Sequence, residues 1–207
     1  MPSIDETQFA AIDFEGAGAQ AGKSDAPVQI GIAVMTRGEI LPAESLRSYI
    51  ACETPITRSA QRVHGICAAD LESAPTLLEL WPEITSLLRG RYVVAHGAAT
   101  EKRFLKIFPF HRFEPWVDTL TFARAVDPAL ASYSLSNLCM HYGVADSLEK
   151  AVPNFRWHDA YCDALASLYL LRHIVKLHNL AASDPSVLIS PCQSHYRRLL
   201  REKSLQQ

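Results

Sequence analysis

The first part of the chain alternates short apolar runs with polar or glycine-rich turns. FAAIDFE (residues 9–15) and VQIGIAVM (28–35) each have the length and the turn-bounded setting of a buried strand. Arg37-Gly38 then predicts a turn into a third strand over about residues 41–50. Three strands joined in this way predict an antiparallel meander.

The rest of the chain changes to helical spacing that is interrupted by single strands. The expected elements are a helix over 75–88, the strand RYVVAHG (91–97), a helix over about 99–108, the strand PWVDTL (115–120), a helix over 132–143, a long helix over 158–178 and a surface helix over 195–203. This order predicts an α/β fold with a mixed five-stranded sheet flanked by helices. We expect one domain over residues 1–182, followed by a basic tail over 183–207 that packs on this domain or extends from it.

Asp13 and Glu15 lie two residues apart on the first predicted strand. Side chains at this spacing project from one face of a strand, while Ile12 and Phe14 project from the other. Such a pair on its own is more often a solvated strand end than a functional site. Two further acids shift the balance toward function.

Glu101 and Asp163 fall on helix faces that should be buried. Glu101 shares its face with Phe104 and Leu105, and Asp163 lies on or beside the apolar stripe of the long last helix. Neither stripe contains an Arg or Lys, and a buried carboxylate is costly unless it is paired or binds a metal. This pattern favours a metal ion as the partner.

The four acids Asp13, Glu15, Glu101 and Asp163 offer only oxygen ligands. A set of this kind favours Mg²⁺ or Mn²⁺ over zinc. Two such ions about 4 Å apart can hold both the attacking and the leaving oxygen of a phosphoryl displacement. The chemistry indicated is hydrolysis of a phosphodiester with two ions.

His158 precedes Asp163 by five residues. It lies either more than a quarter turn round the helix or in the loop that enters it. A neutral imidazole can take a proton from an attacking water, so we interpret His158 as the candidate general base. A histidine at a helix start is more often a surface residue, but the four acids favour the catalytic interpretation, with His96 as the next candidate.

Three segments, IDFEG, VVAHGAATEKRFL and WHDAYCDA, resemble in order and spacing the three motifs of the DEDDh exonucleases, the superfamily of proofreading subunits and oligoribonucleases. The segments PITRSAQRVHGICAADLESAP, VDTLTFAR and YSLSNLCMHYGV are similar to supporting parts of that family. The resemblance covers about residues 9–175. It implies a ribonuclease H-like fold, two divalent ions and release of nucleoside 5′-monophosphates from a 3′-hydroxyl end.

The resemblance also implies roles for single residues. It assigns metal binding to Asp13, Glu15 and Asp163 and the general base to His158. It further implies that the backbone around the first motif and a His-Gly-Ile loop contact the terminal nucleotide. We also expect His96, the histidine of the second motif, to contact the substrate. The expected substrate-binding residues are Phe14, Gly16, Ala17, His64, Gly65, Ile66 and His96.

Two positions depart from the family pattern. In the second motif, the family has His-Asn-Ala followed by an Asp, and this chain has His-Gly-Ala at 96–98 followed by Glu101. After the first motif, the family has Thr-Thr-Gly, and this chain has Gly-Ala-Gly at 16–18. These changes leave open a function of another class, a nucleic-acid-binding module of this fold that has lost efficient catalysis. His158 and Asp163 argue against it, because a decayed enzyme has no reason to keep them.

Composition narrows the expected partner and location. With 207 residues, 48% hydrophobic residues and a net charge of −2, the chain lacks the strongly basic surface that grips long duplexes. We therefore expect a short contact with a single-stranded 3′ end of DNA or RNA. The oligomeric state is left open, and a homodimer is one possibility.

The five cysteines form no CxxC pair and are expected to be reduced. No apolar run is long enough for a membrane and the acidic N-terminus does not resemble a cleaved signal, so we expect a cytoplasmic protein.

The segment GAGAQAGKS invites a second interpretation, as a phosphate-binding loop. Its spacing is wrong, because the required first Gly falls on Ala17. Residues 25–27 also lead into a strand where a helix should begin. The segment is better interpreted as a rim loop beside the site, with Lys23 within reach of substrate backbone.

Overall fold

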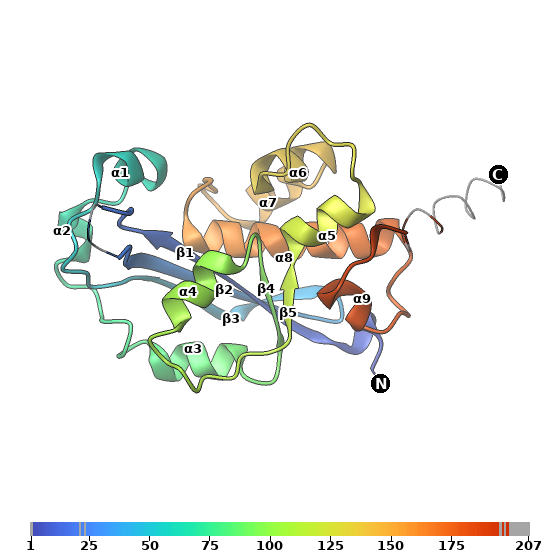
Figure 1. Ribbon diagram of the computed structural model, residues 1–207, viewed down its shortest axis with the longest axis horizontal. Helices are drawn as coiled ribbons and strands as arrows, with labels where there is room; N and C mark the ends of the chain where they lie inside the picture. Colours follow the sequence, from blue (N-terminus) through green and yellow to red (C-terminus); the bar gives the residue numbers. More distant parts are fainter. Residues whose placement is uncertain (1, 21, 23, 195, 197, 199–207) are drawn as a thin grey trace.

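A five-stranded mixed sheet forms the centre of the protein (Figure 1). The computed structural model describes residues 2–20, 22, 24–194, 196 and 198. The strand order is β3-β2-β1-β4-β5, with antiparallel β1–β2 and β2–β3 pairs and parallel β1–β4 and β4–β5 pairs. The strands are β1 (Gln8–Gly16), β2 (Pro27–Thr36), β3 (Glu39–Tyr49), β4 (Tyr92–Ala95) and β5 (Trp116–Asp118). The mixed five-stranded sheet predicted from the sequence is confirmed, including its antiparallel start.

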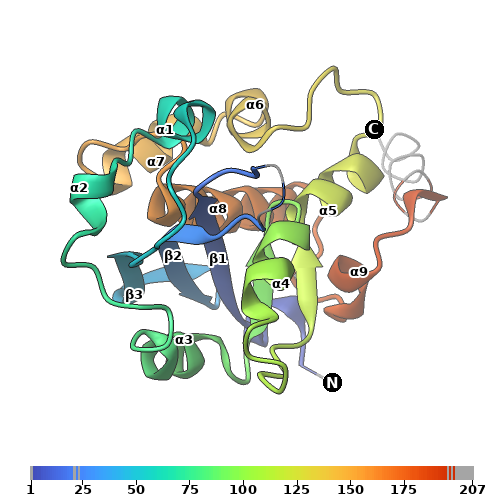
Figure 2. The ribbon, with the colours of Figure 1, turned by 60° about the vertical axis from the view of Figure 1, so that its left-hand side comes forward.

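Helices cover both faces of this sheet, and Figure 2 shows α4 in front of the strands and α8 behind them. The helices are η1 (Ile4–Glu6), α1 (Arg58–His64), α2 (Ala68–Leu71), α3 (Trp81–Leu88), α4 (Ala99–Leu105), α5 (Thr119–Val126), α6 (Leu135–His141), α7 (Ala145–Ala151), α8 (Ala160–Leu177) and α9 (Ser186–Ile189). Within the part of the chain that the structure describes, no helix combines the length and the apolar character needed to span a membrane.

Strand β1 lies in the middle of the sheet and is covered on both faces. Phe9 and Ala11 belong to the core beneath α8, whereas Ile12 and Phe14 belong to the core beneath α3 and α4. Burial on both faces explains why the strand is almost continuously apolar. Its acids are the exception, and they lie toward its C-terminal end.

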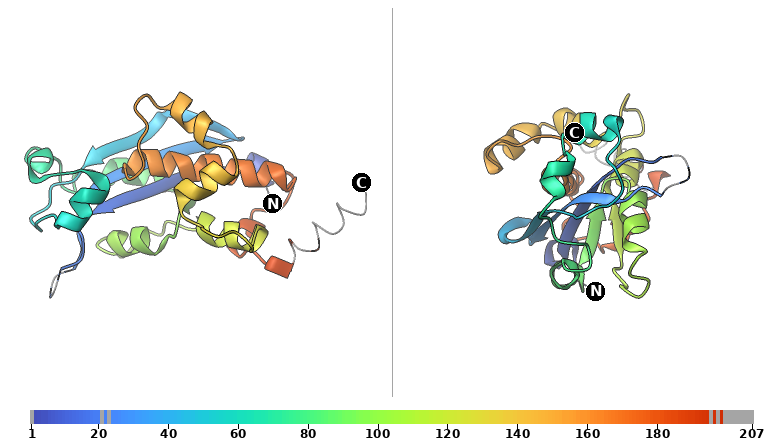
Figure 3. Two further views of the ribbon diagram at one scale, coloured as in Figure 1. Left: turned by 90° about the horizontal axis from the view of Figure 1, so that it is seen from above. Right: turned by 90° about the vertical axis from the view of Figure 1, so that its left-hand side faces the viewer.

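Gly31 of β2 allows the first turn of α8 to approach the sheet. A Cβ atom at this position would overlap the backbone of Ala160 and Tyr161. Gly31 pairs with Asp13 across the β1–β2 ladder, so the helix start lies next to that acid. Figure 3 shows α8 lying along the sheet. The absence of a side chain at Gly31 is therefore what lets α8 bring its own acid, Asp163, to β1.

The strand predicted over 115–120 ends early. β5 stops at Asp118, and α5 begins at the next residue. The Asp118 carboxylate accepts hydrogen bonds from the backbone N–H groups of Leu120 and Thr121, at 3.0 and 3.3 Å. This is an N-cap, which favours a helix start over a continued strand. The prediction of strand through Leu120 is therefore wrong.

Short helices were missed for a related reason. Helices α1, α5 and α7 span seven or eight residues, too few for an apolar repeat to show. The helix predicted over 75–88 begins only at Trp81, because Thr76 and Glu79 form a separate turn joined by hydrogen bonds of 2.8 Å. Capping hydrogen bonds decide where these helices begin, and the hydrophobic periodicity of the sequence does not reveal them.

The C-terminal region adds to the core where it is described. Leu188 of α9 and Tyr196 are buried with residues of α8, and the Tyr196 hydroxyl donates to the carbonyl of Val187 at 3.1 Å. Most of the surface helix expected over 195–203 lies outside the described residues. The division at residue 182 stays a prediction.

The glycine-rich segment does not form a phosphate-binding loop. It leads into β2 at Pro27, so a strand stands where that motif requires a helix. Lys23, expected near substrate backbone, lies outside the described residues.

Gly31→Ala should destabilise the protein strongly, because the added methyl group meets backbone that cannot rotate away. We expect a loss of about 3 kcal/mol in the free energy of unfolding. Gly90→Ala is the matched control, since Gly90 has φ +77 but nothing near its missing Cβ. That variant should lose only about 1 kcal/mol, from the left-handed backbone. Urea unfolding measures both, and equal losses would contradict the close approach of α8.

Candidate active site

Acidic side chains from three elements converge at the C-terminal end of β1. Asp13 and Glu15 come from β1, Asp163 from the first turn of α8 and Glu101 from the first turn of α4. Burial holds the pKa of Asp13 well above its usual value, and the charges of Asp163, Glu101 and Glu15 raise it further. The structure thus places the other three acids that the sequence singled out close enough to Asp13 for their charges to act on it.

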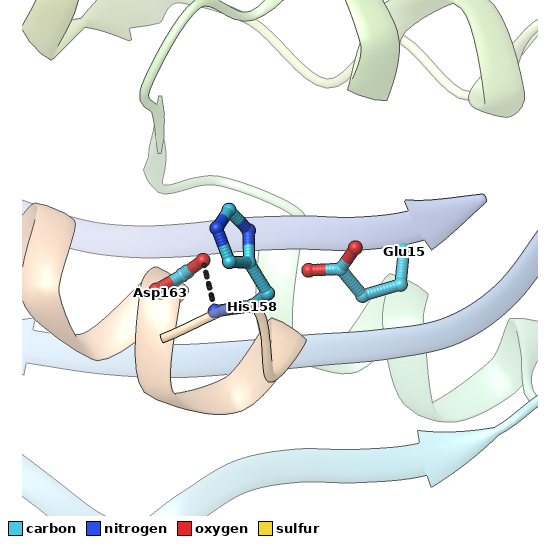
Figure 4. Close-up of side chains that lie close together, drawn as sticks. All are labelled: Glu15, His158 and Asp163. Atoms are coloured by element: carbon cyan, nitrogen blue, oxygen red, sulfur yellow. Dashed lines mark hydrogen bonds between the residues drawn. The ribbon is translucent and has the colours of Figure 1, made fainter. Parts of the chain in front are cut away.

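Glu15, His158 and Asp163 form the tightest group. One ligand atom of each lies within 4.8 Å of the others. Figure 4 shows the Glu15 carboxylate directed toward the His158 ring, with Asp163 on the other side of that ring. A cation could contact these three side chains together.

Two buried carboxylate oxygens have no hydrogen-bond partner among the described residues, Oε2 of Glu101 and Oδ1 of Asp163. Buried polar atoms of this kind are rare and costly. Burial also raises the pKa of Glu15 to about 8 and those of Glu101 and Asp163 to about 7. A bound cation would reverse this preference for the protonated form, so the donor set fits Mg²⁺ or Mn²⁺.

His158 lies in the loop before α8, one of the two positions that the sequence left open. Its backbone has a left-handed φ of 61°, which is uncommon for a residue with a side chain. Its N–H donates to Oδ2 of Asp163 at 3.1 Å. The imidazole is exposed and close to the acids, a position from which it can reach a water molecule.

Asp159 supports this loop and was missed in the sequence. Only 1% of it is exposed, and it caps α8 by accepting the N–H of Cys162. Its Oδ2 also accepts hydrogen bonds from Gln29 and Arg47, both at 2.9 Å. Burial acts to raise the pKa of Asp159, but the hydrogen bonds from Gln29 and Arg47 outweigh it, and the pKa is lowered. One available signal was Gln29, a polar residue in the otherwise apolar run VQIGIAVM.

The His64 ring links α1 to the end of β1. Its Nδ1 accepts the N–H of Ile66 at 3.0 Å, so Nε2 carries the proton and donates to the carbonyl of Gly16 at 3.2 Å. Burial lowers the pKa of His64, which favours this neutral form. Gly65, with φ 78°, ends the helix in the left-handed conformation. The ring of His64 therefore positions Gly16 beside Glu15.

The remaining predicted substrate-binding residues also make internal contacts. The N–H of Ala17 donates to the carbonyl of Ala26, and the carbonyl of Ala17 accepts the N–H of Thr57, both at 2.8 Å. The Phe14 ring packs edge-on against Phe104, on the sheet face away from Asp13. Contacts of Phe14 and Ala17 with a nucleotide stay a prediction.

His96 is held within the protein through both ring nitrogens. Nδ1 lies 2.9 Å from the hydroxyl of Thr119 and Nε2 lies 2.8 Å from the carbonyl of Tyr133. The N–H groups of Gly97 and Ala98 donate to the carboxylate of Asp118. These bonds favour a positioning role for His96, in the loop before Glu101, over direct contact with substrate.

The sequence resembles known proteins over most of its length. The RNase_T model, described as exonuclease, matches residues 10–171. The chain is 26% identical over 180 residues to DNA polymerase III PolC-type of Thermotoga petrophila, covering 84% of this chain and 12% of that protein. It is also 26% identical over 168 residues to a DNA polymerase III subunit epsilon-like protein of Rhodobacter capsulatus, covering 79% of this chain and 23% of that protein. The chain thus spans less than a quarter of the length of either relative.

Two solved structures share the fold. Exonuclease X in complex with 5′ overhanging duplex DNA has a TM-score of 0.67 at 21% identity, over 88% of this chain and 99% of that one. The nuclease domain of 3′hExo, a DEDDh family member bound to rAMP, has a TM-score of 0.64 at 13% identity, over 84% and 94%. The predicted ribonuclease H-like fold is confirmed.

The raised pKa values predict how stability depends on pH when metal is removed by a chelator. Glu15, with a pKa of about 8 against an ordinary 4.5, keeps its proton in the folded state where the unfolded chain has lost it. The folded protein then binds more protons, so its free energy of unfolding should fall as pH rises from about 5 to 8.

Thermal unfolding with a chelator tests this slope. Glu15→Gln should flatten part of it, whereas Glu149→Gln, at an exposed position of α7, should not. Added Mn²⁺ should raise the melting temperature more at pH 8 than at pH 6. A melting temperature that rises with pH in the chelated protein would contradict the assignment.

Proposed function

The chain belongs to the DEDDh exonuclease family, and on this premise we propose that it is a metal-dependent 3′–5′ exonuclease. It removes nucleoside 5′-monophosphates from the single-stranded 3′ end of DNA or RNA. The observation that carries this proposal is the convergence of Asp13, Glu15, Glu101 and Asp163, with two of their buried oxygens unpartnered among the described residues. The structural carboxylate Asp159, by contrast, has a partner for each of its oxygens.

The four acids are the proposed metal ligands. When bound, two divalent ions supply positive charge at the attacking and the leaving oxygen. Asp163 is also fixed by the N–H of His158, which leaves its Oδ1 free to bind a cation. Asp13 and Glu15 are held on a strand that is buried on both faces, so their positions depend little on loop motion.

His158 is the proposed general base. It takes a proton from the attacking water onto a free ring nitrogen as the oxygen–phosphorus bond forms. The bond to the 3′ oxygen of the preceding nucleotide breaks, and that oxygen takes a proton from solvent to become a 3′-hydroxyl. The phosphate leaves on the terminal nucleoside. The exposed ring beside Glu15 and Asp163 supports this role, because a water molecule can reach it.

The loop formed by His64, Gly65 and Ile66, together with Gly16 and Ala17, is the proposed site of the terminal nucleotide. His64 holds the two segments together, which supports a shared surface next to Glu15. The similar structures were solved with duplex DNA and with rAMP, so they support a nucleic-acid substrate without selecting the sugar. The cytoplasmic location and the homodimer stay predictions.

The proposal is tested with purified protein on 5′-labelled single-stranded DNA and RNA. We expect stepwise shortening that needs Mg²⁺ or Mn²⁺ and a free 3′ end. Asp163→Asn should be nearly inactive, and His158→Ala should lose about 10²-fold or more in rate. Asp146→Asn, at an exposed position of α7, should keep the parent rate. Cleavage by Asp163→Asn at the parent rate would contradict the metal site.

Glu101 variants in the same assay separate an enzyme from a binding module. Glu is one methylene longer than Asp, and Mg²⁺ demands near-ideal geometry, so we expect Mn²⁺ to support the parent better. Glu101→Ala should be nearly inactive, and Glu101→Asp should keep partial activity with a shift toward Mg²⁺. An inert parent beside an active Glu101→Asp would favour the binding module.

A further inference from the structure

Arg156 is an exposed cation at the edge of the acidic site. Its guanidinium makes no hydrogen bond or ion pair with any residue that the structure describes. Nη1 would lie 3.7 Å from a Cβ at Gly65, so the side chain reaches across to the loop after α1. Its charge also opposes the rise in the pKa of Glu15 and lowers that of His64. Arg156 thus lies beside the His64 loop, close enough to Glu15 for its charge to act on that carboxyl.

The backbone around Arg156 is well anchored. Phe155 and Trp157 on either side pack against the core beneath α8, with their rings edge-on and centroids 4.9 Å apart. The next residue, His158, is tied to Asp163 through its N–H. With its two neighbours facing inward, Arg156 is directed outward from a loop of fixed shape. This arrangement reduces the backbone entropy that the loop would lose on binding a ligand.

Two other arginines, Arg47 and Arg103, already have partners. Arg47 pairs with Asp159 at 2.9 Å, and Arg103 pairs with Asp25 at 3.0 Å. Their charges are used to fix α8 and the loop before β2. Arg156 differs from both because its planar fork of donors is available, and this fork matches the oxygens of a phosphate group.

We propose that Arg156 binds the phosphate on the 5′ side of the terminal nucleoside, the group that is cleaved and leaves with the product. This inference rests on the proposed function. Four carboxylates balance two divalent ions, so an incoming phosphodiester adds one negative charge to the site. Arg156 supplies one positive charge between the His64 loop and Glu15, where that phosphate must lie to reach the acids. It is a binding residue and takes no proton.

The test measures binding of the products AMP and dAMP by calorimetry in Mn²⁺, which needs no turnover. Arg156→Ala should weaken both about 10-fold or more, because a charge-assisted hydrogen bond is lost. Arg156→Lys should keep part of the affinity, since it retains the charge without the fork. Lys150→Ala removes one positive charge from an exposed position of α7 and should change neither affinity.

Mn²⁺ affinity without nucleotide separates phosphate binding from a structural role. Loss of a positive charge beside the acids should leave Mn²⁺ binding unchanged or tighter in Arg156→Ala. If AMP and Mn²⁺ both weakened, the residue would act by shaping the loop, and the inference would be wrong. An unchanged AMP affinity would also overturn it.

A cleavage assay tells failure of this inference from failure of the proposed function. Arg156→Ala should raise KM for the oligonucleotide about 10-fold or more. A parent protein that cleaves no substrate would refute the exonuclease proposal. A cleaving parent and an Arg156→Ala variant with the same KM and AMP affinity would refute only the role of Arg156.

Discussion

Docking of the first turn of α8 on Gly31 places Asp163 beside Asp13 and Glu15, and these carboxylates repel one another in a partly buried setting. Without a cation the group favours protonated carboxyls near neutral pH, because protonation removes this repulsion. Most of the site can be understood as a consequence of holding these charges together. Burial of apolar residues on both faces of β1 stabilises the fold and so offsets the repulsion among these carboxylates.

Two acids at the start of α8 show how environment separates a structural carboxylate from a proposed metal ligand. Asp159 has Gln29, Arg47 and the helix N–H of Cys162 as partners, so its pKa is lowered and its charge is fully used. Asp163, one turn later, has an unpartnered oxygen, and burial raises its pKa to about 7. Asp159 fixes the helix start, whereas Asp163 keeps an unpartnered oxygen and is the proposed metal ligand. His64 and His96 act like Asp159, since each holds a loop of the site through both ring nitrogens.

The sequence predicted the sheet and the four acids because both depend on local pattern. Inward-facing carboxylates such as Glu101 and Asp163 conflict with the apolar stripes that carry them, and this conflict is visible without coordinates. The supports were not predictable in this way. Gln29 and Asp159 are 130 residues apart and meet only after folding, and Gly31 matters only because α8 crosses it. Short helices such as α5 were missed because an Asp118 cap, and not periodicity, starts them.

The most direct test of this account is calorimetric titration of the protein with Mn²⁺ in buffers of different ionisation enthalpy, which counts the protons released on binding. Carboxyls with pKa values near 7 and 8 must ionise to bind the metal. The account predicts release of about one proton or more at pH 6.5, declining toward pH 8.5. Absence of Mn²⁺ binding, or binding without proton release at pH 6.5, would contradict the view that these acids are held together for a cation.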